Sequence, residues 1–170
     1  MNAWASALLL SLTGVSLVCP VSSLAQSSTP KQPQSTTVCD LVSDPLRFSG
    51  TFVSVYGIIT KWHHGLEVSD ARCKQHALLL EWPDQVEPHP LFEVTRNDQY
   101  AKFEDALRTH EPGTIGSKGH IEATVQGRFD YVLSKDKNGK YVRSRQGFGH
   151  LNASSVRLII QSVSNVKICP

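Results

Sequence analysis

The chain has 170 residues, of which 40% are hydrophobic and 19% are charged, and its formal net charge is +2 at pH 7. This length allows one modest hydrophobic core, and the small net charge does not by itself indicate a nucleic-acid partner. The sequence has no internal repeat, and beyond the N-terminal segment it has no apolar run long enough to cross a bilayer.

The first 25 residues have the pattern of a secretory signal peptide. An apolar run covers residues 7–18, and Ser23-Leu24-Ala25 offers small residues where a signal peptidase reads them. We expect cleavage after Ala25 and a secreted or periplasmic protein with no stable membrane span; the alternative is a membrane anchor. Residues 26–36 are mostly Ser, Thr, Pro and Gln, which predicts a flexible leader before a single domain at residues 37–170.

Hydrophobic periodicity predicts the elements of this domain. A short helix is expected from Thr37 to Asp44, because Thr37 and Asp40 have the spacing of a capping box and Pro45 disfavours further helix. Residues 50–61 are rich in β-branched and aromatic residues and predict a long strand, with a bend at Gly57. Further strands are expected at 66–69, 76–82, 119–133 and 156–168, and a helix with one apolar stripe at 97–109.

The order of these elements indicates the fold. A helix between the third and fourth strands is the arrangement of the OB-fold, a five-stranded Greek-key barrel. We therefore predict a mainly β domain with an OB-fold-like barrel, whose open end is closed by the 97–109 helix. The alternative is an open α+β sheet, but a bent first strand favours closure. Asn138-Gly139 also predicts a hairpin between the last two barrel strands.

Motifs in both halves of the mature chain consist mainly of structural glycines and core residues. They are Cys39-Asp40-Leu41, Phe48-Ser49-Gly50, Gly127-Arg128-Phe129 and Gly147-Phe148-Gly149-His150-Leu151. With these motifs, most of the mature chain resembles a group of small exported bacterial proteins of unknown function. The resemblance implies an OB-fold-like barrel and supplies no catalytic residue.

Three cysteines stay in the chain once Cys19 leaves with the signal peptide. In an oxidising compartment two of them should pair, and three pairings are possible. We predict Cys39–Cys73, because the N-terminal helix and the loop after the second strand meet at one end of the barrel. Cys39–Cys169 is the main competitor. Cys169, which we do not associate with the resembling group, is otherwise expected as a free thiol or an intermolecular link.

Candidate binding residues concentrate in the hairpin segment 131–145. Its cations alternate with aromatic residues: Tyr131, Lys135, Lys137, Lys140, Tyr141, Arg143 and Arg145. In OB-folds the connection between the last two strands commonly contacts ligand, and such residues suit an anionic polymer because charges hold the anion while rings stack. Trp62, in the turn after the first strand, is a further stacking candidate. The alternative is a solvated hairpin whose lysines protect its edges.

His63, His64 and His150 are the candidates for a different class of function, a small metal-dependent or hydrolytic enzyme. Adjacent histidines on an extended chain point in opposite directions, and neither a zinc-binding spacing nor a nucleophile elbow accompanies them. We therefore predict no metal, no cofactor and no catalytic residue. The favoured hypothesis is an exported, non-enzymatic module that binds an anionic polymer or an envelope protein; a structural or envelope-stress protein is the third.

Overall fold

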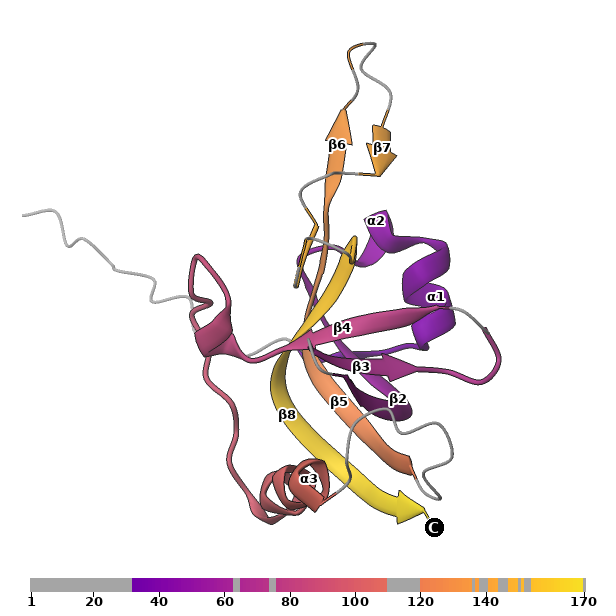
Figure 1. The fold of residues 1–170 in the computed structure, drawn as a ribbon. Helices are drawn as coiled ribbons and strands as arrows, with labels where there is room; N and C mark the ends of the chain where they lie inside the picture. The colour runs from indigo at the N-terminus through magenta and orange to yellow at the C-terminus, as the bar shows by residue number, and fades with distance from the viewer. Residues whose placement is uncertain are drawn as a thin grey trace, which may run out of the picture. The chain divides into compact units, whose positions relative to one another are not determined.

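The computed structural model describes residues 32–62, 65–73, 76–109, 120–135, 137, 141–143, 147–149, 151 and 154–169 (Figure 1). Within these residues, five strands form a closed barrel. They are β2 (Thr51–Trp62), β3 (Gly65–Ser69), β4 (Ala77–Glu81), β5 (His120–Tyr131) and β8 (Val156–Cys169).

The barrel closes because β2 pairs with two different neighbours. Its second half is antiparallel to β3, while residues 51–59 are antiparallel to β5. β8 then joins β5 to β4, antiparallel to the former and parallel to the latter. This pairing confirms the OB-fold-like barrel and contradicts the open-sheet alternative.

Gly57 lies next to the point where β2 begins to pair with β3. A Cβ atom at this position would lie 2.4 Å from the carbonyl oxygen of Ser69 and 2.7 Å from a methyl group of Val68. Because such contacts are far shorter than van der Waals separation, only glycine lets the two backbones approach so closely. The predicted role of Gly57 in shaping the strand therefore has a steric basis.

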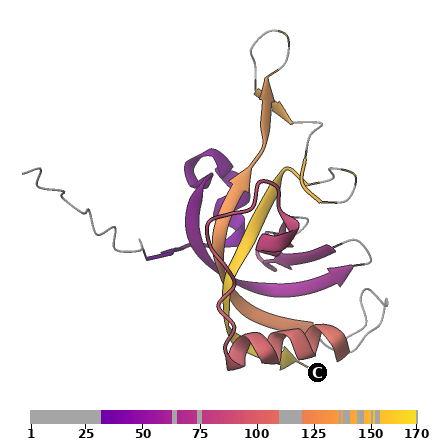
Figure 2. The ribbon, with the colours of Figure 1, turned by 90° about the vertical axis from the view of Figure 1, so that its left-hand side faces the viewer.

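One hydrophobic core fills the barrel and includes the apolar stripe of a helix. Val53, Val55 and Ile59 alternate along β2 and are buried on its inner side. α3 (Asp98–Thr109) adds Phe103 and Ala106 to the same cluster. The two views place α3 at one end of the barrel (Figures 1 and 2), in agreement with the predicted helix that closes the open end.

The N-terminal part of the domain is held to the barrel at several points. α1 (Val38–Ser43) starts with the predicted capping box, in which the Asp40 backbone N–H donates to Thr37 Oγ1 at 3.0 Å. Cys39 forms a disulfide with Cys73, with Cα atoms 5.5 Å apart, as predicted. α2 (Pro45–Phe48) follows directly, and β1 (Gln34–Ser35), at the end of the predicted leader, pairs in parallel with β2.

The predicted hairpin is present beyond the end of β5. β6 (Leu133–Lys135) pairs with β7 (Tyr141–Arg143) as a separate two-stranded sheet. Figures 1 and 2 both show it extending from the end of the barrel opposite α3. A short 3₁₀ helix, η1 (Pro83–Gln85), follows β4. No helix among the described residues is long and apolar enough to cross a membrane.

Candidate functional site

A groove of about 1430 Å³ lies between the barrel and α3. The end of β2, the end of β4 and the start of β3 form one wall, and the connection from Pro83 to Arg96 and one side of α3 form the other. The connection is held against the barrel, because the Thr95 N–H donates to the Gln161 carbonyl oxygen at 2.7 Å. Phe92 also contacts Phe52 edge-on, with ring centroids 5.1 Å apart.

Two tryptophans of the groove have different roles. Trp82 packs edge-on against Tyr100 and Phe103, with centroid distances of 5.7 and 6.4 Å, and so fixes α3 to the barrel. Trp62 is 50% exposed, and its Nε1–H donates to Glu67 Oε2 at 3.0 Å. That hydrogen bond orients the indole while its ring stays open to a ligand.

The polar groups of the groove are partly committed to the fold. Lys61 Nζ donates to the Leu107 carbonyl oxygen at 2.9 Å, near the end of α3, where helical carbonyls lack partners. The Tyr100 hydroxyl donates to Glu104 Oε1 at 2.7 Å. Burial, together with that hydrogen bond, raises the pKa of Tyr100 to about 12. Asp84, Glu93 and Arg96 are exposed along the connection.

The groove contains Trp62, whereas Tyr131 and Lys137, the two predicted hairpin residues whose side chains the structure describes, lie outside it. Tyr131 is partly buried against the core, and its N–H donates to Ser49 Oγ at 3.3 Å. Lys137 is exposed, while Lys135 lies in β6, paired with Tyr141 of β7, and Leu133 pairs with Arg143. Neither Tyr131 nor Lys137 lines the groove. The predicted hairpin site therefore stays a prediction.

The remaining candidates fall outside the described residues. They are Lys140, Arg145, His63, His64 and His150. Their predicted roles stay predictions.

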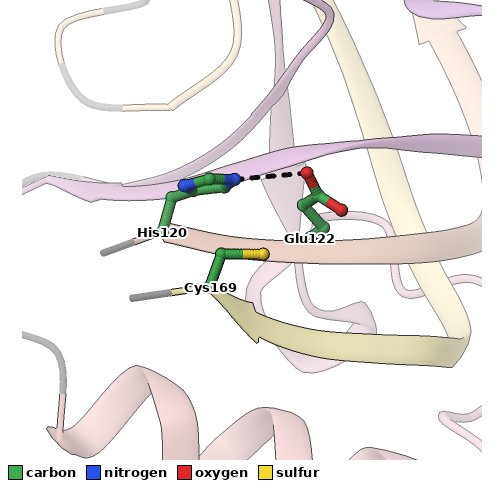
Figure 3. Close-up of side chains that lie close together, drawn as sticks. All are labelled: His120, Glu122 and Cys169. Atoms are coloured by element: carbon green, nitrogen blue, oxygen red, sulfur yellow. Dashed lines mark hydrogen bonds and ion pairs between the residues drawn. The ribbon is translucent and has the colours of Figure 1, made fainter. Parts of the chain in front are cut away.

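A group of metal-ligating side chains that the sequence reasoning missed lies on the outer face of the barrel (Figure 3). His120 Nε2 is 3.2 Å from Glu122 Oε1, and one ligand atom each of His120, Glu122 and Cys169 lies within 4.8 Å of the others. His120 and Glu122 are two residues apart in β5, and residues i and i+2 of a strand share a face. Their spacing could therefore have indicated from the sequence that the two side chains lie together. Cys169 comes from β8, where it pairs directly with His120.

A second polar cluster lies further along the same two strands. Arg157 of β8 donates to Glu81 Oε2 and to Asp130 Oδ2, both at 3.0 Å, and Arg128 donates to the same Asp130 carboxylate at 2.9 and 3.0 Å. The Arg157 guanidinium also lies over the Phe148 ring, 4.0 Å from its centroid. Two cations and two anions satisfy one another here, which indicates a structural role.

Comparison with known proteins finds no matching family model, no matching curated protein and no matching solved structure. What the groove and the clusters do is therefore inferred from their geometry.

Proposed function

We propose that this protein is an exported, non-enzymatic binding module whose groove takes a short extended segment of a partner protein. The observation that carries the proposal is the groove of about 1430 Å³ with a half-exposed, hydrogen-bonded Trp62 on its wall. Concave sites with aromatic walls and a few placed polar groups are the usual form of binding sites. The Cys39–Cys73 disulfide supports the exported location, because disulfides persist in oxidising compartments.

The charges of the groove favour a polypeptide over an anionic polymer. Asp84 and Glu93 would repel a polyanion, whereas Arg96, on the same connection, would attract one. A peptide carries apolar, cationic and anionic groups together and therefore matches such a mixed wall. Trp62 would supply the aromatic anchor that dominates many protein interfaces.

The lining of the groove supports binding over catalysis. Among the described lining residues there is no Ser, Thr or Cys to act as a nucleophile. The Tyr100 hydroxyl donates to Glu104, and the exposed His89 has its Nε2 atom 3.3 Å from Glu87 Oε1. Positioned nucleophile–base pairs are what covalent catalysis requires.

Selection of displayed random peptides on the purified protein tests the proposal. Selected peptides should bind the wild type, and Trp62→Ala should weaken them by about 30-fold or more, the effect of losing a hot spot of about 2 kcal/mol. Tyr56→Ala is the matched control, because Tyr56 is similarly exposed at 45% and does not line the groove.

Two outcomes would overturn the groove as the binding site. One is a set of peptides that bind Trp62→Ala as tightly as the wild type. The other is binding of heparin that is lost in a Lys137→Ala, Lys140→Ala, Arg143→Ala triple variant and is unaffected by Trp62→Ala. The second result would move the ligand to the hairpin.

A further inference from the structure

Three different metal-ligating side chains converge where β5 begins and β8 ends. His120 and Cys169 are direct partners in the β5–β8 ladder, and Glu122 follows His120 by two residues, so all three project from the same face. Figure 3 shows the imidazole, the carboxylate and the thiol grouped on that face. We propose that His120, Glu122 and Cys169 form a binding site for a zinc ion.

The donor set indicates the kind of metal. An imidazole nitrogen, a thiolate sulfur and a carboxylate oxygen together suit Zn²⁺, whereas Mg²⁺ and Ca²⁺ take oxygen ligands. Zinc held by three protein side chains keeps a fourth position of its tetrahedron open to water or to another donor. The fold thus supplies three donors from two adjacent strands without rearrangement of the backbone.

The present distances are close to those that zinc requires. Metal–ligand bonds of about 2.0–2.3 Å place neighbouring ligands roughly 3.3–3.7 Å apart in a tetrahedron. His120 Nε2 and Glu122 Oε1 are already 3.2 Å apart. The widest separation within the group is at most 4.8 Å, which rotation of a side chain at the barrel surface can close.

Neighbouring residues orient the carboxylate for this purpose. The Tyr56 hydroxyl, from β2, donates to Glu122 Oε2 and leaves Oε1 facing His120. Outer partners of this kind commonly fix the direction of metal ligands. The Lys167 ammonium makes a cation–π contact with the Tyr56 ring, 5.7 Å from its centroid.

The thiol is available because the other two mature cysteines are committed. Cys39 and Cys73 form the disulfide, and Cys169 is the free cysteine of the described residues. The site lies outside the groove, since none of its three ligands lines it. Zinc binding here is therefore independent of the function proposed above.

Titration with Co²⁺, a spectroscopic substitute for Zn²⁺, tests the site in the full-length protein. A Cys19→Ser background leaves Cys169 as the single thiol outside the disulfide, whether or not residues 1–25 are cleaved. We expect one equivalent of Co²⁺ to give a thiolate-to-metal charge-transfer band, Zn²⁺ to displace it, and either metal to protect Cys169 from alkylation.

Single substitutions identify the ligands. Cys169→Ser should abolish the band, and His120→Ala and Glu122→Gln should weaken binding by more than about 10-fold, while Tyr56→Phe should weaken it about 10-fold and retain the band. His76→Ala is the matched control, because His76 is exposed and lies outside the cluster. It should bind as the wild type does.

Several results would overturn the proposal. They are a cobalt complex without the thiolate band, binding that survives both His120→Ala and Glu122→Gln, or binding that is lost only when His63 and His64 are replaced. Alkylation of Cys169 at the same rate with and without Zn²⁺ would overturn it as well. In this measurement the three proposed ligands are unchanged, so misfolding of a ligand variant cannot explain the result.

Discussion

Two polar clusters share the outer face of β5 and β8, and they differ in how their charges are balanced. The Arg157 cluster pairs two guanidinium groups with two carboxylates, and every group is hydrogen-bonded. The His120 cluster brings together three side chains that can each bind a metal ion, and its carboxylate is hydrogen-bonded to the His120 imidazole and the Tyr56 phenol. In the Arg157 cluster the positive and negative charges balance one another. In the His120 cluster the three side chains surround the position proposed for the metal ion.

The comparison teaches that proximity of polar groups has two physical meanings. When opposite charges are largely removed from water, their attraction mainly offsets the cost of desolvation, and loss of one group destabilises the fold because its partners are left uncompensated. Side chains that each offer an electron pair to a metal ion attract one another only weakly. Their closeness therefore adds little stability until a metal ion binds. Substitutions in the Arg157 cluster should therefore mainly lower the stability of the fold, and substitutions in the His120 cluster should mainly weaken metal binding.

The largest expected effect is on the stability of the Arg157 cluster. The Arg157 side chain is only 13% exposed, and its replacement leaves Glu81 without its guanidinium partner and Asp130 with Arg128 alone. We expect Arg157→Met to lower the free energy of unfolding by about 3 kcal/mol. Urea denaturation at neutral pH measures this as a lower midpoint with an unchanged slope.

Lys167→Met is the matched control for that variant, because Lys167 is a cation on the same strand beside the His120 cluster. The cluster makes no ion pair with it among the described residues, and exposed substitutions of this kind usually change stability by less than about 0.5 kcal/mol. Equal losses for the two variants would remove the distinction between the clusters.

The second expected effect is stabilisation by zinc. A ligand that binds only the folded state at 100 times its dissociation constant adds about 2.7 kcal/mol. The wild type should therefore melt several degrees higher with Zn²⁺, and Cys169→Ser should not. Arg157→Met should keep the gain, because Arg157 lies 12 positions before Cys169 along β8 and the effects of distant substitutions add. Calorimetry with and without Zn²⁺ checks this, and an equal shift for Cys169→Ser would contradict it.

Much of the fold was predictable because local rules and the global fold agree. Alternation identified the barrel strands, Thr37 and Asp40 identified the start of α1, and the element order identified the barrel. α2 was missed because Pro45 was interpreted only as the end of a helix, although proline is also favourable at the first position of the next one. The disulfide followed from the strand order, which brings Cys39 and Cys73 to the same end.

The sites were harder to predict because they depend on register and on the path of a loop. β5 and β8 change register between Glu122 and Thr124 and again between Gln126 and Gly127. The sequence pattern does not show such irregularities, so the pairing of Cys169 with His120 was not foreseeable. The groove likewise depends on how residues 83–96 cross the barrel, and this path has no periodic signal. Trp62 is the last residue of β2 and is half-exposed, and its predicted role in stacking on a ligand stays a prediction.

The smallest expected effect sharpens the comparison at a single carboxylate. Hydrogen bonds from Tyr56 first and His120 second hold the pKa of Glu122 below its ordinary value of 4.5. A lowered pKa means that the carboxylate stabilises the fold above about pH 4.5 and that this contribution is lost as the pH falls through the folded-state pKa. In the metal-free protein, Tyr56→Phe should raise the pKa of Glu122 toward 4.5 and reduce that acid sensitivity, as NMR titration of the carboxyl carbon would show.

Asp70 is the control: its pKa is lowered by hydrogen bonds from Arg72, and it should not change in the same spectra. An unchanged Glu122 pKa would mean that the phenol does not hold this carboxylate, and the open cluster would then lose the partner that aims its oxygen at His120.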